Sequence, residues 1–199
     1  GIEPELEDPA ELVGDCVGVY FEIDEDIYLD KGGAIEAADY IIALFNEISL
    51  LYDADGIGVY ISDIFVWEVV SPYDGITTTI DLLYLFGSTT EVWTGDIGHF
   101  VSYRGNGGVA WVDIICYGDQ YYRKGVSDVN STFEEYPVYS WSVEVVAHEM
   151  GHNLGSPHTH ACAWNGDDTA IDCCGPAAGY DEGCDAPLPV SGTVMSYCH

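Results

Sequence analysis

The sequence predicts an α+β fold, with a mixed, mostly parallel, twisted sheet of five strands, a long helix and a small irregular C-terminal lobe. Segments rich in β-branched and aromatic residues alternate with segments of helical periodicity. After residue 158, Gly, Asp, Pro and Cys replace any periodic pattern. A length of 199 residues suits one domain over 1–199. We expect an upper lobe of about 1–155 and a lower lobe of about 156–199.

The first half of the chain predicts two parallel strands joined by a helix. Residues 1–15 are acidic and hold two prolines, which indicates an extended surface leader. Strand formers dominate 16–23 and 57–70, whereas apolar residues recur at helical spacing over 34–52. This succession implies a right-handed crossover between neighbouring strands. The turn at 53–56 resembles the start of a calcium-binding loop, but the glutamate that completes such a loop is absent. An ordinary turn is therefore favoured, and the sequence does not predict a structural calcium site.

The middle of the chain predicts a shorter helix and three more strands. The helix covers 79–86, and the strands cover 98–103, 108–116 and 126–129. A glycine-rich connection, 104–107, favours an antiparallel hairpin between the first two of these strands. An edge strand beside a cleft offers unpaired N–H and C=O groups, to which an extended peptide can pair.

A metal site is predicted by the segment 148–158, which reads HEMGHNLGSPH. On a helix, His148 and His152 lie on the same face because one turn takes ~3.6 residues. Gly155 favours a left-handed helix end, and the proline that follows forces a turn that can return His158 as a third ligand. Three neutral imidazoles leave a fourth position of a tetrahedral zinc ion open for water, as in catalytic sites.

Glu149 follows the first histidine, so its carboxylate can take a proton from that water as a general base. Ser140 suits the N-cap of this helix. Two alternatives stay open at this point: surface histidines without a metal, and His160 as third ligand in place of His158.

The composition excludes two classes of partner. The chain has 35 acidic and 4 basic residues and a formal net charge of -31, which repels nucleic acid and anionic lipid. No run of eighteen apolar residues is present, so we expect no membrane span. The charge fits either adaptation to salt or a merely acidic secreted protein.

The cysteines predict a secreted protein in an oxidising, extracellular or periplasmic setting. Their spacing contains no C-x-x-C pair, and four of them crowd the C-terminal end, which is typical of disulfides. The odd count leaves one thiol free or a partner outside the chain. Because the chain begins at Gly1, we expect a mature form that has lost its targeting segment and a zymogen pro-segment. The seven are Cys16, Cys116, Cys162, Cys173, Cys174, Cys184 and Cys198.

Together, these motifs carry a family resemblance. The pattern H-E-x-x-H-x-x-G-x-x-H, followed about forty residues later by SGTVMSYC at 191–198, resembles the metzincin zinc endopeptidases. Met195 resembles their Met-turn methionine, an apolar floor beneath the imidazoles. The segments 107–116 (GGVAWVDIIC) and 125–129 (GVSDV) resemble most the reprolysin, or adamalysin, branch and its bacterial relatives.

The resemblance implies a zincin-like fold and a zinc-dependent endopeptidase with one catalytic Zn²⁺. It implies hydrolysis of extended protein or peptide substrates in a cleft beneath the edge strand, and we expect a monomer. It also implies a disulfide between Cys116 and Cys198. The implied substrate strand consists of Gly108, Val109, Ala110 and Trp111.

Two departures and two rivals remain. Reprolysins usually place Asp after the third histidine, where this chain has Thr159. Tyr197 could ligate zinc, donate to the oxyanion or simply pack, and the loop 187–193 is expected to shape the specificity pocket. The rivals are a non-catalytic zinc-containing adhesion or protein-binding module and a zinc hydrolase of non-peptide substrates. The intact motif disfavours the first, and the edge strand disfavours the second.

Overall fold

The computed structural model describes residues 16–178, 186, 187, 189 and 192–198. The predicted acidic leader at 1–15 lies outside the described residues, as does part of the predicted 187–193 loop.

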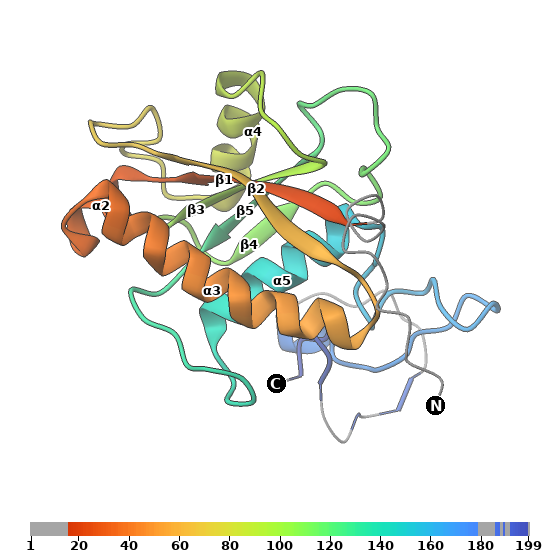
Figure 1. Cartoon of the computed structure of the whole chain (residues 1–199). Helices are drawn as coiled ribbons and strands as arrows, with labels where there is room; N and C mark the ends of the chain where they lie inside the picture. Colours follow the sequence, from red (N-terminus) through yellow and green to blue (C-terminus); the bar gives the residue numbers. More distant parts are fainter. Residues whose placement is uncertain (1–15, 179–185, 188, 190–191, 199) are drawn as a thin grey trace, which may run out of the picture.

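One five-stranded sheet forms the centre of the molecule, in the order β2-β1-β3-β5-β4 (Figure 1). All neighbouring strands are parallel except β4, which is antiparallel to β5 at the edge. The predicted mixed, mostly parallel sheet with an antiparallel edge strand is therefore confirmed. The strands are β1 (Val17–Ile23), β2 (Val59–Val66), β3 (Ile97–Ser102), β4 (Gly108–Ala110) and β5 (Lys124–Asp128).

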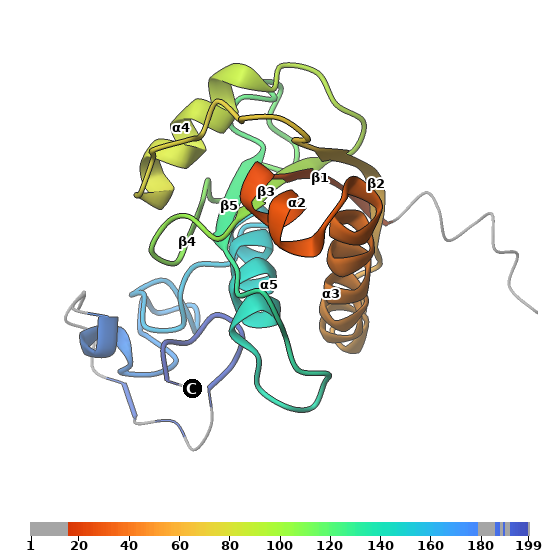
Figure 2. The same ribbon diagram turned by 90° about the vertical axis from the view of Figure 1, so that its left-hand side faces the viewer.

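Helices cover both faces of the sheet (Figures 1 and 2). Two long helices, α3 and α5, lie on one face, and α4 lies on the other. The short helix α2 was not predicted; Asp24 caps its start and Gly32, with φ 88°, ends it. The helices are α2 (Glu25–Lys31), α3 (Ala34–Ala54), α4 (Thr79–Thr89), α5 (Trp141–Asn153) and a 3-10 helix, η1 (Gly175–Ala178).

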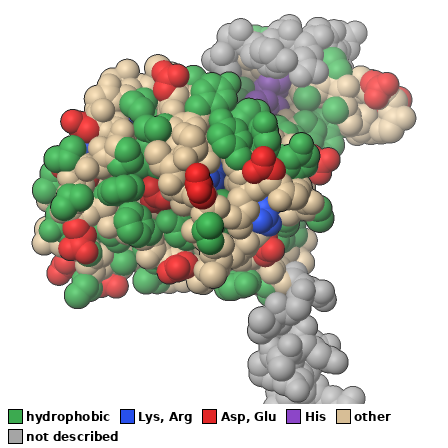
Figure 3. Space-filling view, turned by 90° about the horizontal axis from the view of Figure 1, so that it is seen from above, with side chains coloured by type: hydrophobic (Ala, Val, Ile, Leu, Met, Phe, Trp, Pro, Cys, Tyr) green, Lys and Arg blue, Asp and Glu red, His purple; other side chains and the backbone are tan. Residues whose placement is uncertain are grey.

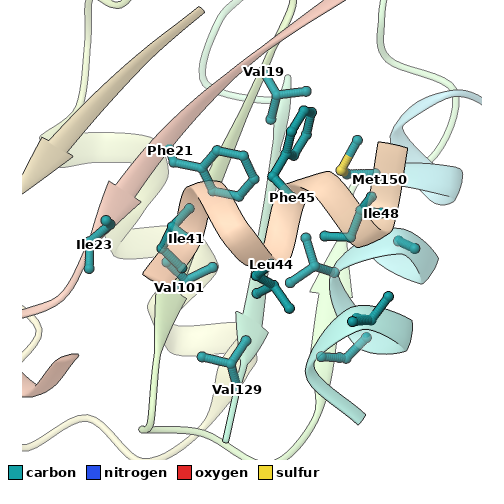
Figure 4. Close-up of a cluster of buried hydrophobic side chains, with 14 of the residues drawn as sticks. Val19, Phe21, Ile23, Ile41, Leu44, Phe45, Ile48, Val101, Val129 and Met150 are labelled. Atoms are coloured by element: carbon teal, nitrogen blue, oxygen red, sulfur yellow. The ribbon is translucent and has the colours of Figure 1, made fainter. Parts of the chain in front are cut away.

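Apolar side chains fill both interfaces. Alternate residues of β1 point to opposite faces, so Val19 and Phe21 join α3 and α5, whereas Tyr20 joins α4. Figure 4 shows Phe21 of β1 beside Ile41 and Phe45 of α3, and Ile48 beside Met150 of α5. The helix that carries the zinc motif is thus packed into the larger core. No helix of the described residues is long and apolar enough to cross a bilayer.

The predicted hairpin between 98–103 and 108–116 is wrong. β3 and β4 are not neighbours, because β5 lies between them and pairs with both. Gly105 and Gly107 have φ of 119° and 110°, which lets the connection cross the end of β5, where the Asp128 N–H donates to the Gly107 carbonyl at 3.0 Å. The edge strand also ends at Ala110.

The predicted disulfide between Cys116 and Cys198 is wrong as well. Cys198 is bonded to Cys174, with Cα atoms 5.5 Å apart, whereas Cys116 is exposed and forms no disulfide. Asp172 brings the two bonded cysteines together, because its carboxylate accepts the Cys174 N–H and the hydroxyl of Ser196. Cys162 is also disulfide-bonded, in keeping with the stapled C-terminal region.

Candidate active site

Helix α5 holds three functional side chains in a buried position. His148, Glu149 and His152 are each no more than 7% exposed. The helix begins after Ser140, as predicted, although the Ser140 hydroxyl accepts a hydrogen bond from the Glu134 N–H instead of capping α5. Apolar side chains of α5 pack on the sheet, so the histidine face is fixed by the core.

The chain turns sharply after α5. Gly155 has φ 100°, a left-handed conformation that favours glycine, and its N–H donates to the His152 carbonyl at 2.9 Å. The predicted helix end is therefore where the sequence places it. Beyond the turn, the His158 carbonyl accepts hydrogen bonds from the Ala161 N–H and the Trp164 indole, which orient the third histidine.

The three histidines converge through their Nε2 atoms. The Nε2 atom of His158 lies 3.0 Å from that of His152 and 3.1 Å from that of His148. Among the residues that the structure describes, these three form the only cluster of His, Cys, Asp or Glu suited to a metal ion. Figure 3 shows histidine side chains reaching the surface near a group of hydrophobic ones.

The cluster fits a zinc ion. The Nδ1 atoms of His148 and His152 donate to the carbonyls of Val194 at 2.6 Å and Ser156 at 2.8 Å. With their protons there, the Nε2 lone pairs face one another, an arrangement that needs a cation. Tetrahedral zinc with arms of 2.0–2.1 Å spaces its ligands by ~3.3 Å, close to the distances here. Burial and the neighbouring histidines lower the pKa of His158 to about 3, which keeps this imidazole neutral.

The turn around Met195 contacts the segment that carries the third histidine. The Met195 carbonyl accepts hydrogen bonds from the backbone N–H and the hydroxyl of Thr159, next to the third histidine. The Met195 sulfur lies so close to α5 that a Cβ atom at Gly151 would be 2.6 Å from this sulfur. Gly151 therefore leaves room for the Met195 sulfur at this position, a role that the sequence reasoning missed.

Glu149 lies between the histidines and the edge strand. A Cβ at Gly108 would lie 2.3 Å from the Glu149 Oε1 atom, so this glycine makes room for the carboxylate. The Oε2 atom is buried and has no hydrogen-bond partner among the described residues. Burial, with a smaller contribution from the charge of Glu144, raises the pKa of Glu149 to about 8.

A cleft of about 490 Å³ opens over these groups. Gly108, Val109 and Ala110 of β4 form one wall, and Glu149 is among the residues of the other. Trp111 follows the strand, and its backbone N–H donates to the Lys124 carbonyl. Since β4 is the last strand of the sheet, its outer edge faces the cleft.

Tyr197 and His160 lie beside the third histidine. The Tyr197 hydroxyl is 2.8 Å from His158 Nε2, and its ring stacks on His148 with centroids 5.7 Å apart. Burial and the charges of Glu149 and Glu144 raise the pKa of Tyr197 to about 12. The His160 ring stacks on His158 at 4.8 Å and is not part of the three-histidine cluster.

Comparisons with known proteins agree with this geometry. The reprolysin-type model of metallo-peptidase family M12 matches residues 15–198. The chain belongs to metallopeptidase family M12. Membership implies a metalloendopeptidase, and a three-histidine cluster is typical of catalytic zinc in M12 peptidases. No curated protein matches the chain.

A comparison with solved structures finds 85 matching chains. One is described as the structure of a chaperone-substrate complex, with a TM-score of 0.55 and 14% sequence identity. The match covers 74% of this M12 chain and 25% of that chain, so this chain spans about a quarter of that chain's length. At this identity the likeness concerns the fold alone.

Proposed function

We propose that this M12 metallopeptidase is a zinc-dependent endopeptidase that cleaves extended polypeptides bound along β4. The proposal depends most on the position of Glu149. This side chain lies against Gly108 of the edge strand, and the three histidine Nε2 atoms converge nearby. An extended substrate that pairs with β4 would therefore pass over both the cluster and the carboxylate.

The residues divide the reaction between them. His148, His152 and His158 would hold the zinc ion, and their Nδ1 contacts and the Met195 turn would fix its position. When bound, the ion polarises the scissile carbonyl and lowers the pKa of the attacking water. Glu149 in its ionised form, which the positive charge of a bound ion would favour, accepts a proton from that water and delivers it to the leaving amine. The Tyr197 hydroxyl, which lies 2.8 Å from His158 Nε2, would donate a hydrogen bond to the oxyanion.

We also infer that the chain acts as a monomer with one catalytic domain, because the three histidines, Glu149 and the cleft form a complete site without a residue from a second copy. The Cys174–Cys198 disulfide supports a protein that is secreted to an oxidising environment.

Replacing Glu149 with Gln tests the general-base assignment. The amide keeps the shape of the side chain but cannot take a proton, so we expect kcat for a peptide substrate to fall by ~10²–10⁴-fold. Zinc content, measured by metal analysis of the purified protein, should match that of the wild type. Near-normal turnover by the variant would refute the assignment. Proteolysis that persists with a zinc chelator would refute the zinc dependence.

Replacing Gly108 with Ala tests the placement of the edge strand. The new Cβ would meet Glu149 Oε1 at 2.3 Å and displace the carboxylate, so we expect kcat/KM to fall by roughly 100-fold. Gly118→Ala is the matched control, because a Cβ at Gly118 would meet nothing within 4 Å. Both variants should give the wild-type circular dichroism spectrum at the assay temperature, which shows that they are folded, and Gly118→Ala should also keep the wild-type melting temperature. Equal activity of the two would show that Gly108 does not position Glu149.

A further inference from the structure

The strand that faces the cleft is short and depends on anchors at its ends. β4 has three residues and comes last in the strand order, so β5 is its neighbour in the sheet. Pairing over so short a strand contributes little stability by itself. Nevertheless, β4 and the nearby Val112 form one wall of the cleft. The position of this wall relative to the histidines therefore depends on the contacts at the two ends of β4.

The start of β4 is anchored to β5. The Gly107 N–H donates to the Asp128 carboxylate at 3.2 Å, and the Asp128 N–H donates to the Gly107 carbonyl at 3.0 Å. Asp128 is the last residue of β5, so these two hydrogen bonds fix β4 within the sheet. A link to α5, the helix that carries two of the histidines, lies at the other end of β4.

Asn153 forms this link. It is the last residue of α5, directly follows His152 and is 0% exposed. Its side-chain amide donates to the Trp111 carbonyl at 2.8 Å and to the Lys124 carbonyl at 3.1 Å. Trp111 directly follows β4, and Lys124 is the first residue of β5. One amide group therefore joins both strands to the end of α5.

Backbone hydrogen bonds of the same region strengthen the link. The Asp113 N–H donates to the His152 carbonyl at 2.9 Å, and the Ile114 N–H donates to the Asn153 carbonyl at 3.1 Å. The segment that follows β4 is thus bonded to the last two residues of α5, one of which belongs to the histidine cluster. A substitution of Asn153 removes the amide contacts and leaves these backbone bonds in place.

We propose that Asn153 is a positioning residue that fixes β4 relative to the three-histidine cluster, and so aligns an extended substrate for attack. This inference rests on the proposed endopeptidase function. Asn153 is not among the residues that line the cleft, so it acts on the substrate through the strand. Without the amide, the Trp111 carbonyl loses this donor and the wall can shift. A shift of about 1 Å can lower a rate by ~100-fold, although the free edge of β4 can still bind peptide.

Kinetics separate alignment from binding. Asn153→Ala, assayed on a peptide long enough to pair with β4, should lower kcat by roughly 10–100-fold and change KM by less than about 3-fold. Ser142→Ala is the matched control, because it removes another buried hydrogen bond of α5, which the Ser142 hydroxyl accepts from the Asn130 N–H at the opposite end of the helix. This control should keep both constants within about 3-fold of the wild type. Equal kcat values for the two variants would overturn the inference.

Two further measurements distinguish positioning from other roles of Asn153. Zinc affinity, measured by competition with a chelator, should stay within about 3-fold of the wild type in Asn153→Ala. A loss of affinity large enough to explain the lower kcat would assign the effect to His152 and overturn the role of β4. Asn153→Leu fills the space of the amide without a donor, so it should lose as much kcat as Asn153→Ala. A normal kcat in the Leu variant would mean that Asn153 only fills space.

Hydrogen exchange separates this inference from the proposed function, because it requires no turnover. In Asn153→Ala, the backbone amides of Trp111, Asp113 and Ile114 should exchange roughly 10-fold faster than in the wild type, whereas in Ser142→Ala they should not. If the wild type cleaves nothing but this difference persists, the positioning of β4 stands and the endopeptidase proposal fails. If the wild type cleaves peptides but neither kcat nor exchange responds to Asn153→Ala, the positioning role fails alone.

Discussion

The two regions that supply the histidine cluster are stabilised in different ways. His148 and His152 lie on α5, whose apolar side chains are part of the larger core (Figure 4). His158 lies in the C-terminal segment, here residues 154–178, 186, 187, 189 and 192–198. In the described part of this segment, the buried apolar residues are only Ala161, Ala170 and Cys174.

Polar contacts position the C-terminal segment instead. The Met195 carbonyl accepts two hydrogen bonds from Thr159, and the Asp172 carboxylate accepts two more from the chain around the Cys174–Cys198 disulfide. A hydrogen bond contributes ~0.5–1.5 kcal/mol net, whereas burying one large apolar side chain contributes ~1.5–3 kcal/mol. We therefore expect the sheet and α5 to determine global stability, and the C-terminal segment to open locally at lower cost.

The largest effect should follow a cavity in the core. Ile48 of α3 is 0% exposed, so Ile48→Ala should lower the free energy of unfolding by ~2–5 kcal/mol. Ile35 lies on the same helix but is 74% exposed, so Ile35→Ala should change that free energy by less than ~0.5 kcal/mol. Urea denaturation followed by tryptophan fluorescence measures both. Equal losses would show that the core does not control global stability.

The sequence predicted the parts of the fold that depend on local periodicity. Apolar spacing placed α3, α4 and most strands, because burial of one face requires that spacing. Helix α2 was missed because it is seven residues long and acidic, although Asp24 and Gly32 were usable end signals. The hairpin was mispredicted because strand order depends on long-range pairing: nothing near 104–107 shows that β5 enters between β3 and β4.

In the candidate site, too, the sequence predicted the features that depend on local spacing and missed those that depend on contacts between distant segments. The spacing of His148, Glu149 and His152 has local consequences on any helix, so the sequence could predict their common face. The roles of Gly108 and Gly151 depend on close approaches between distant segments, which no residue pattern reveals. The supporting carbonyls of Ser156 and Val194 are backbone groups and carry no residue signature. Disulfide pairing failed for a similar reason, since spacing does not determine connectivity.

A smaller effect should follow removal of the disulfide. Its cysteines are 24 residues apart, so Cys174→Ser with Cys198→Ser should cost ~3 kcal/mol in the chain-entropy account. If the two regions differ as proposed, most of this loss should appear as weaker zinc binding, which competition with a chelator measures. A smaller part should appear as a lower midpoint of urea denaturation. Cys116→Ser, at an exposed cysteine without a disulfide, should change neither quantity. A urea midpoint as low as that of Ile48→Ala would show that the two regions unfold as one unit.

The smallest effect should follow loss of the charge on Asp172. Burial works to raise the pKa of this carboxyl group, but its contact with Thr159, the hydrogen bonds that it accepts from the Cys174 N–H and the Ser196 hydroxyl, and the nearby His160 outweigh burial and hold the pKa below its usual value. A lowered pKa in the folded state means that the stabilisation is complete above the ordinary value of about 4 and is lost as the pH falls through the folded-state pKa. Asp172→Asn should remove ~1–3 kcal/mol at neutral pH.

Hydrogen exchange locates this loss. In Asp172→Asn, the Cys174 amide, which donates to Asp172 Oδ1 at 2.9 Å, should exchange faster, together with the Cys198 amide, which donates to Ser196 Oγ. Amides of α5 should keep their wild-type rates, because they are protected by the apolar core. The wild type should lose protection of the same two amides only below pH ~4, where Asp172 becomes protonated. Faster exchange along α5 in the variant would mean that the polar network also stabilises the helix that carries His148 and His152, so the contrast between the two regions would not hold.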